Sequence, residues 1–208
     1  MKIIDLEKMD YEKARAIQHE AVLEVADGGE PKLFLLEHDP VITVGRHGGM
    51  ENLHVDPEWL KRQGISLCKS ERGGNITCHY PGQLVAYPIF PVSRRGGLKR
   101  LFHDVEEAAI RTLDEFGVRA DRCEGRPGVW TAEGKIASIG IAVRKWVSYH
   151  GLSLNVYEDT SLFDLITLCG LSDARATSLH AETDGARPVM EEVKNVLAGQ
   201  FEQIFAQA

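Results

Sequence analysis

Apolar residues recur at helical spacing in three segments of the chain. Asp10 can cap a helix that runs to about Ala26, and the segment from Leu98 to Phe116 carries the clearest apolar stripe. Gly117 is expected to end that second helix, and a third helix is predicted to start at Pro188. One face of the third helix carries Val189, Val193, Val196, Leu197, Phe201 and Phe205.

Shorter segments between these helices have the character of strands. The first group is "KLFLLE", "VITVG", "ISLCK", "NITCHY" and "LVAYPIF", with a short helix at "PEWLKRQ". Residues 128–156 resemble a meander in which Ile139, Ile141 and Val143 alternate with Gly, Ala and Arg, and a last strand is expected to break at Gly151. Strands and helices do not alternate regularly, and no repeat or linker is visible. We therefore predict a single domain, residues 1–208, with an α+β fold: a mixed, largely antiparallel sheet with packed helices.

Charge and composition narrow the classes of partner. The net charge of −7 argues against nucleic acid, and an acidic protein partner would need a local basic patch. The densest basic cluster is Arg94, Arg95, Lys99 and Arg100, and Arg144-Lys145 is a second. No segment has the roughly 20 apolar residues of a membrane helix, and the N-terminus does not resemble a signal peptide. The sequence thus predicts a cytoplasmic protein with reduced thiols and no membrane partner.

Metal and nucleotide motifs are missing from the sequence. The four cysteines form no C-x-x-C pair, and the histidines form no H-x-x-x-H pattern. No G-x-G-x-x-G is present, and "EGKI" at 133–136 lacks the Ser or Thr of a phosphate loop. We therefore expect neither a metal nor a cofactor.

Several polar residues beside glycines have both a structural and a functional interpretation. Each of the glycines next to strand-like runs suits a bulge or turn, but the set of Gly73, Gly140 and Gly151 favours a ligand groove. Cys169, which precedes Gly170, is either a packed thiol or a nucleophile. At the start of an apolar strand, Lys135 either faces solvent or lines the groove. For His79 and His150, at strand ends, the alternatives are groove-lining and structural positions.

Four stretches together resemble one enzyme family, the octanoyl-(acyl-carrier-protein):protein N-octanoyltransferases, also called lipoyl(octanoyl) transferases. They are "RGGNITCHYPGQLVAYPI" (72–89), "GRPGVW" (125–130), "KIASIGIAVRKWVSYHGLSLNV" (135–156) and "LCGL" (168–171), in the family's order. The resemblance implies a biotin/lipoate protein ligase-like fold. It also implies transfer of an octanoyl group from acyl carrier protein to a lysine of a lipoyl domain. The acceptors implied are the lipoyl domains of 2-oxoacid dehydrogenase E2 subunits and the glycine cleavage H protein.

The resemblance also implies which residues form the site. Its catalytic pair falls on Cys169 and Lys135. From its position at a strand end beside Gly151, His150 is expected to support the site. The substrate-binding residues implied are Arg72, Gly73, Gly74, Asn75, Ile76, Thr77, Cys78, His79, Ser138, Ile139, Gly140, Gly151, Leu152 and Ser153. The sequence departs from the family at Leu168, where Pro is usual, and at Tyr80, where Gly is usual. A Tyr at this position could narrow the groove or alter the turn.

A mechanism follows as a hypothesis from this pair. The Cys169 thiolate takes the acyl group from a thioester, and Lys135 favours the thiolate and then accepts a proton from the incoming amine. Neither step needs ATP. Two alternatives remain: an ATP-dependent lipoate or biotin ligase of the same fold, and an acyl-binding protein without turnover.

Overall fold

The structure is a computed structural model that describes residues 1–92, 96–157, 159–168, 174–183 and 187–206. Its helices are α1 (Tyr11–Ala26), α2 (Pro57–Arg62), α3 (Gly97–Glu115), α4 (Leu179–Glu182) and α5 (Met190–Ala206), with 3-10 turns η1 (Met50–Asn52) and η3 (Ser161–Leu165). Its strands are β1 (Lys2–Met9), β2 (Lys32–His38), β3 (Val41–Val44), β4 (Ser66–Lys69), β5 (Ile76–His79), β6 (Gln83–Ile89), β7 (Asp121–Cys123), β8 (Arg126–Trp130), β9 (Lys135–Arg144) and β10 (Val147–Asn155).

The strands form two sheets. The larger has the order β1-β2-β6-β10-β9-β8-β7, in which only β1 and β2 pair in parallel. The smaller has the order β4-β3-β5, parallel between β3 and β4 and antiparallel between β3 and β5. The predicted α+β fold with a mixed, largely antiparallel sheet is therefore confirmed.

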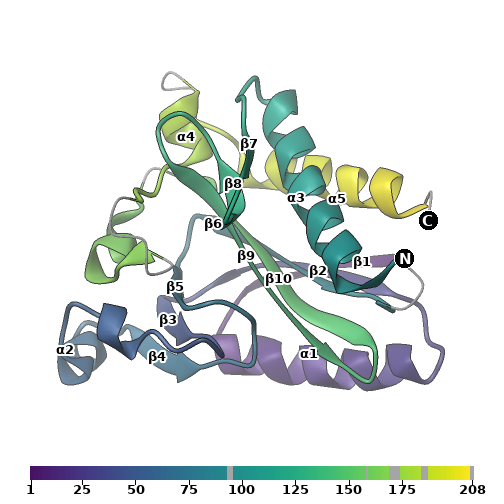
Figure 1. The fold of residues 1–208 in the computed structure, drawn as a ribbon, viewed down its shortest axis with the longest axis horizontal. Coiled ribbons are helices and arrows are strands. Elements are labelled where there is room, and N and C mark those ends of the chain that lie inside the picture. The colour runs from purple at the N-terminus through teal and green to yellow at the C-terminus, as the bar shows by residue number, and fades with distance from the viewer. Residues whose placement is uncertain (93–95, 158, 169–173, 184–186, 207–208) are drawn as a thin grey trace.

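Helices cover both faces of the large sheet (Figure 1). In β2, Leu33 and Leu35 pack into the core beneath α3 and α5, while Phe34 and Leu36 pack toward α1 on the other face. A strand buried on both faces reads as a continuous apolar run, which explains the segment "KLFLLE". A third core joins the small sheet to α2 and η3. Among the described helices, none is both long and apolar enough to cross a membrane.

Some local predictions were wrong. Strand β1 was missed because its sequence, "KIIDLEKM", lacks strict alternation and contains charged residues. Strand β10 does not break at Gly151, since this residue pairs with Gly140 of β9 and the next residue pairs with Ala86 of β6. Hydrogen bonds on both sides hold the strand through the glycine. The last helix begins at Met190 and leaves Val189 exposed.

Leu98 also differs from its prediction. The stripe from Leu98 to Phe116 placed it on the buried face of a helix, but its side chain is 45% exposed. It lies in the first turn of α3, and Leu101 and Val105, one and two turns further on, are the first of the stripe to be fully buried.

Candidate active site

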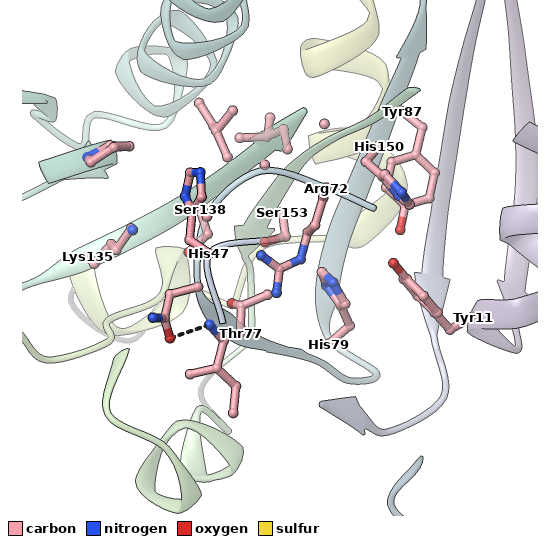
Figure 2. Close-up of a pocket in the computed structure, with 18 residues that line it drawn as sticks. Tyr11, His47, Arg72, Thr77, His79, Tyr87, Lys135, Ser138, His150 and Ser153 are labelled. Atoms are coloured by element: carbon pink, nitrogen blue, oxygen red, sulfur yellow. Dashed lines mark hydrogen bonds between the residues drawn. The ribbon is translucent and has the colours of Figure 1, made fainter. Parts of the chain in front are cut away.

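A cavity of about 310 Å³ lies where β5, β9 and β10 meet the start of α1 (Figure 2). Its size is at the lower end of ligand pockets, which span roughly 300–1,000 Å³. The lining residues are Tyr11, His47, Arg72, Gly74, Asn75, Ile76, Thr77, His79, Tyr87, Pro127, Lys135, Ser138, Ile139, Gly140, His150, Gly151, Leu152 and Ser153. The wall combines apolar side chains with polar groups from distant parts of the chain.

Lys135 lies at one end of this cavity, opposite Tyr11 (Figure 2). Its side chain is 3% exposed, and its Nζ lies 5.4 Å from the centre of the Trp130 ring. The stem of the lysine passes directly over Gly128, where a Cβ would come within 2.7 Å of Lys135 Cε. Gly128 also has a φ of +113°, so any other residue there would be strained and would displace the lysine.

The backbone of Lys135 is tied to the segment that follows residue 173. Lys135 N–H donates to the carbonyl of Arg175 at 2.8 Å, and Thr177 N–H donates to the carbonyl of Lys135 at 3.0 Å. Ala176 forms a parallel bridge with Lys135 between them. The start of β9 is therefore held by residues close in sequence to the "LCGL" motif.

Arg72 crosses the middle of the cavity wall. Its Nε and Nη2 donate to Thr43 Oγ1 at 3.1 and 2.9 Å, and Nη2 donates to the Thr43 carbonyl at 2.6 Å. Gly140 leaves room for it, because a Cβ there would lie 3.0 Å from Arg72 Cδ. This contact explains why a glycine stands within an otherwise apolar strand.

The end far from Lys135 is built from buried aromatic and imidazole rings. The Tyr11 ring is nearly parallel to those of His79 and His150, with interplanar angles of 11° and 3°. Tyr11 donates to Ser70 Oγ at 2.7 Å, and His79 Nδ1 is hydrogen-bonded to Gln83 Oε1 at 2.8 Å. These bonds fix the ring orientations, so this end of the cavity is rigid.

His38 and Tyr87 form a second pair of rings at this end, and Tyr87 itself lines the cavity. His38 Nε2 is hydrogen-bonded to the hydroxyl of Tyr87 at 2.8 Å, and His38 Nδ1 to the carbonyl of Met9 at 3.0 Å. The amide of Gln18, itself buried in α1, accepts a hydrogen bond from the backbone N–H of His150 at 2.7 Å. Side chains from α1, β2, β6 and β10 thus meet in one buried polar cluster.

Burial keeps these rings uncharged. It lowers the pKa of His38 to about 4, lowers that of His79 well below its ordinary value, and lowers that of His150. It raises the pKa of Tyr11 to about 12. At neutral pH this end of the cavity therefore presents neutral rings, which can border an apolar ligand without the cost of burying a charge.

Most of the predicted site residues line the cavity. Of the seventeen residues named from the sequence, Gly73 and Cys78 lie outside the lining, and Cys169 lies outside the described residues. Cys78 is fully buried in the small-sheet core, whereas its neighbours Thr77 and His79 line the cavity. Successive side chains of a strand point to opposite faces, so a thiol between two lining residues faces away.

The sequence also left some lining residues unidentified. These are Tyr11, His47, Tyr87 and Pro127. Tyr87 carried a signal, because it is the one residue with a hydroxyl in the otherwise apolar run "LVAYPIF". Pro127 belongs to the quoted motif "GRPGVW". Tyr11 and His47 have no such local signal, since only the packing of α1 and of the β3–η1 loop brings them to the cavity.

The two departures from the family pattern do not touch the cavity. Tyr80 packs edge-on against Phe163 and donates to Asn155 Oδ1 at 3.1 Å, so it lies in the small-sheet core. Of the two alternatives for Tyr80, narrowing of the groove is therefore excluded. Leu168 is buried in the same core.

The described residues form no metal site and place no thiol in the cavity. Among residues 1–92, 96–157, 159–168, 174–183 and 187–206, no group of three His, Cys, Asp or Glu side chains could hold a metal ion. Of the described cysteines, none lines the cavity: Cys78 faces the core, Cys123 is exposed on β7, and burial raises the pKa of the Cys68 thiol to about 11.

The buried histidines predict a specific dependence of stability on pH. The pKa of His38 is about 4 in the folded protein and 6.5 in the reference state, so the unfolded chain binds its proton first as the pH falls. Stability is therefore lost between pH 6.5 and 4, by about 3 kcal/mol from His38 alone at 1.36 kcal/mol per pKa unit. His79 and His150 act in the same direction. Chemical denaturation at several pH values measures this loss.

The matched variant for this measurement is His38→Gln. It retains a polar side chain opposite Tyr87 but does not titrate, so the loss between pH 6.5 and 4 should shrink by about 3 kcal/mol, whatever its stability at pH 7. If the free energy of unfolding depends on pH in the variant as it does in the unsubstituted protein, His38 is not the group responsible.

Comparison with known proteins shows the family to which the chain belongs. Residues 10–202 match the family described as the lipoyl protein ligase A/B catalytic domain. The structure also resembles a lipoate-protein ligase A bound with ATP (TM-score 0.76, 20% identity, covering 99% of this chain and 85% of that one). A biotin protein ligase from Aquifex aeolicus is a more distant match (TM-score 0.58, 13% identity, covering 100% and 69%). The chain therefore belongs to the lipoyl protein ligase A/B catalytic domain family, and these structures share its fold.

More similar relatives show the group of enzymes within this family to which the chain belongs. An octanoyltransferase from Nitratidesulfovibrio vulgaris (strain DSM 19637 / Miyazaki F) is 61% identical over 207 residues, covering 99% of this chain and 95% of the relative. An octanoyltransferase from Maridesulfovibrio salexigens is 53% identical, covering 99% and 96%. Within the family the chain is thus a member of the octanoyltransferases, and it is an acyltransferase.

Proposed function

We propose that this protein transfers an octanoyl group from octanoyl-acyl carrier protein to a specific lysine of lipoyl domains, through a thioester on Cys169. The acceptors are the lipoyl domains of 2-oxoacid dehydrogenase E2 subunits and the glycine cleavage H protein. This reaction is the first step of endogenous protein lipoylation. Residues 1–208 act as one catalytic domain, in the cytoplasm and without a cofactor.

One observation carries the proposal. Lys135 is buried in the wall of a partly apolar cavity, and its backbone is hydrogen-bonded to Arg175 and Thr177, just after the "LCGL" motif. A long alkyl group suits the stretch of wall formed by Ile76, Ile139 and Leu152. We propose Cys169 as the nucleophile because the "LCGL" motif resembles the one that carries the catalytic thiol in the family. In support, no described cysteine lines the cavity.

The first step exchanges one thioester for another. The Cys169 thiolate attacks the acyl carbonyl, the bond to the carrier's sulfur breaks, and that sulfur leaves as a thiol after taking a proton. One thioester bond is broken and another is formed, so the free-energy change of this step is close to zero. The step therefore needs no ATP. The Lys135 ammonium, brought near the thiol, favours the thiolate and can supply the proton to the leaving sulfur.

The second step forms an amide. The amine of the acceptor lysine attacks the Cys169 thioester, the C–S bond breaks, and the thiolate is released. The amine must lose a proton as it attacks, and Lys135 as a neutral amine accepts it. An amide is more stable than a thioester, so this step is downhill.

The rest of the cavity binds the acyl chain and excludes water. Arg72, Gly74, Asn75, Ile76, Thr77 and His79 supply one wall, and Ser138, Ile139, Gly140, Gly151, Leu152 and Ser153 supply the other. The neutral rings of Tyr11, His79 and His150 close the end that lies opposite Lys135. A closed end keeps water from the thioester and disfavours its hydrolysis.

A direct assay tests this function. The purified protein is mixed with an octanoylated carrier and an unmodified lipoyl domain in the absence of ATP, and the lipoyl domain is weighed by intact-protein mass spectrometry. We expect the lipoyl domain to gain one octanoyl group. Loading only from octanoate and ATP would identify a ligase instead, and binding of the donor without turnover would identify an acyl-binding protein.

A further inference from the structure

A second apolar groove lies beside the acyl cavity, between α3 and the β7–β8 hairpin. Its volume is about 570 Å³. It is lined by Leu98, Lys99, Phe102, His103, Glu106, Cys123, Gly125, Arg126 and Pro127. Pro127 lines both this groove and the acyl cavity. The residue after Pro127 is Gly128, which is packed against the Lys135 side chain, so the groove leads to the end of the cavity at which the acyl transfer is proposed.

Charged hydrogen bonds hold the groove in shape. Glu106 accepts from the backbone N–H of Gly128 at 3.3 Å and from Arg122 Nε at 3.1 Å. Arg122 Nη2 donates to the carbonyl of His103 at 3.1 Å and to Glu107 Oε2 at 2.8 Å. These contacts fasten the hairpin to α3, so the groove is formed before any ligand arrives.

The lining has the character of a site for an amphiphilic anion. Leu98 is a large apolar side chain that is 45% exposed, and Phe102 and Pro127 extend the apolar surface toward the cavity. Lys99 carries positive charge at the exposed start of α3, and the carboxylate of Glu106 is paired with Arg122. Arg126 also lines the groove, with its guanidinium 5.8 Å from the centre of the Trp130 ring. This local surface contrasts with the net charge of −7 for the chain.

We propose that this groove holds the phosphopantetheine arm of the acyl donor. The inference rests on the proposed function, because it concerns how the thioester reaches Lys135. The branched alkyl part of the arm packs on Leu98, Phe102 and Pro127, and its phosphate pairs with Lys99. The thioester end then passes Pro127 into the cavity. Carrier protein and coenzyme A both present this arm, so the arm itself is the ligand that we assign.

Two variants of exposed residues test the groove without disturbing the core. Leu98→Asp places a negative charge on the apolar surface, and Lys99→Glu repels the phosphate. The donors are octanoyl carrier, octanoyl-coenzyme A and octanoyl-N-acetylcysteamine, which lacks the phosphate and the branched segment. We expect about a tenfold rise in KM for the first two donors in each variant, with kcat and the KM for the lipoyl domain unchanged. The third donor should be unaffected.

The control is Lys61→Glu, the same charge reversal on α2, away from both the groove and the cavity. This variant should leave the KM for each of the three donors unchanged. A rise in KM for the carrier alone would assign the groove to the carrier's protein surface, and a rise for the lipoyl domain alone would assign it to the acceptor. Both results overturn the proposal. An equal rise in KM for all three donors would overturn it as well.

The two proposals fail in distinguishable ways. If the unsubstituted protein transfers no octanoyl group from the carrier, the proposed function is wrong. If it does transfer the group and neither Leu98→Asp nor Lys99→Glu changes KM, only the assignment of the groove is wrong.

Discussion

Cys169→Ala should form no covalent acyl-enzyme and should lose octanoyl transfer by at least about 10⁴-fold. The thiolate is the group that receives the acyl chain, and removal of a nucleophile from a cooperating set abolishes nearly all of the catalysis that the set provides. Intact-protein mass spectrometry after mixing with an octanoylated carrier detects the adduct, and the rate of lipoyl-domain modification measures the loss. Donor binding should persist, since the cavity is lined by other residues.

The matched control is Cys68→Ala. Cys68 lies in β4, away from the cavity, and its thiol has a raised pKa of about 11, so its removal should leave both adduct and rate unchanged. If the adduct persists in Cys169→Ala, the nucleophile is another residue, and peptide mapping of the adduct would identify Cys78, Cys123 or a different side chain.

Lys135→Met should lower the transfer rate by about 10²- to 10⁴-fold, the range for loss of a general acid–base group. Methionine keeps the apolar stem that packs over Gly128 and removes only the amine. Both half-reactions should slow, because the thiol loses the neighbouring cation and the attacking amine loses its proton acceptor. Quenched-flow measurement of the acyl-enzyme, together with steady-state transfer, resolves the two steps.

Lys135→Arg separates the two roles. A guanidinium keeps the positive charge but does not give up its proton in proteins. This variant should still form the acyl-enzyme, because the charge favours the thiolate and the leaving sulfur can take its proton from water. It should then accumulate the acyl-enzyme, while transfer to the lipoyl domain stays slow. Equal loss of both steps in Lys135→Met and Lys135→Arg, with unchanged thermal stability, would mean that Lys135 positions the substrate and does not move protons.

Local patterns in the sequence determined most of the fold. The helix from Asp10 and the helix to Gly117 depend on residues within one or two turns, and so do their caps. The strands around the Pro81-Gly82 turn and the alternation in β9 are equally local. The motif around Lys135 and its order relative to the other motifs identified the family. Each of these signals is carried by near neighbours in the chain.

Only the tertiary structure decided which of these elements share a surface. Tyr11 and Tyr87 belong to unremarkable local patterns, yet the order β2-β6-β10-β9 and the packing of α1 place both in one cavity with His150. Leu98 continues the stripe of its helix, yet the hairpin beside α3 leaves it exposed over a groove. The physical reason is that periodicity shows which face of an element is apolar, whereas the surface that covers this face is selected by packing summed over the whole core.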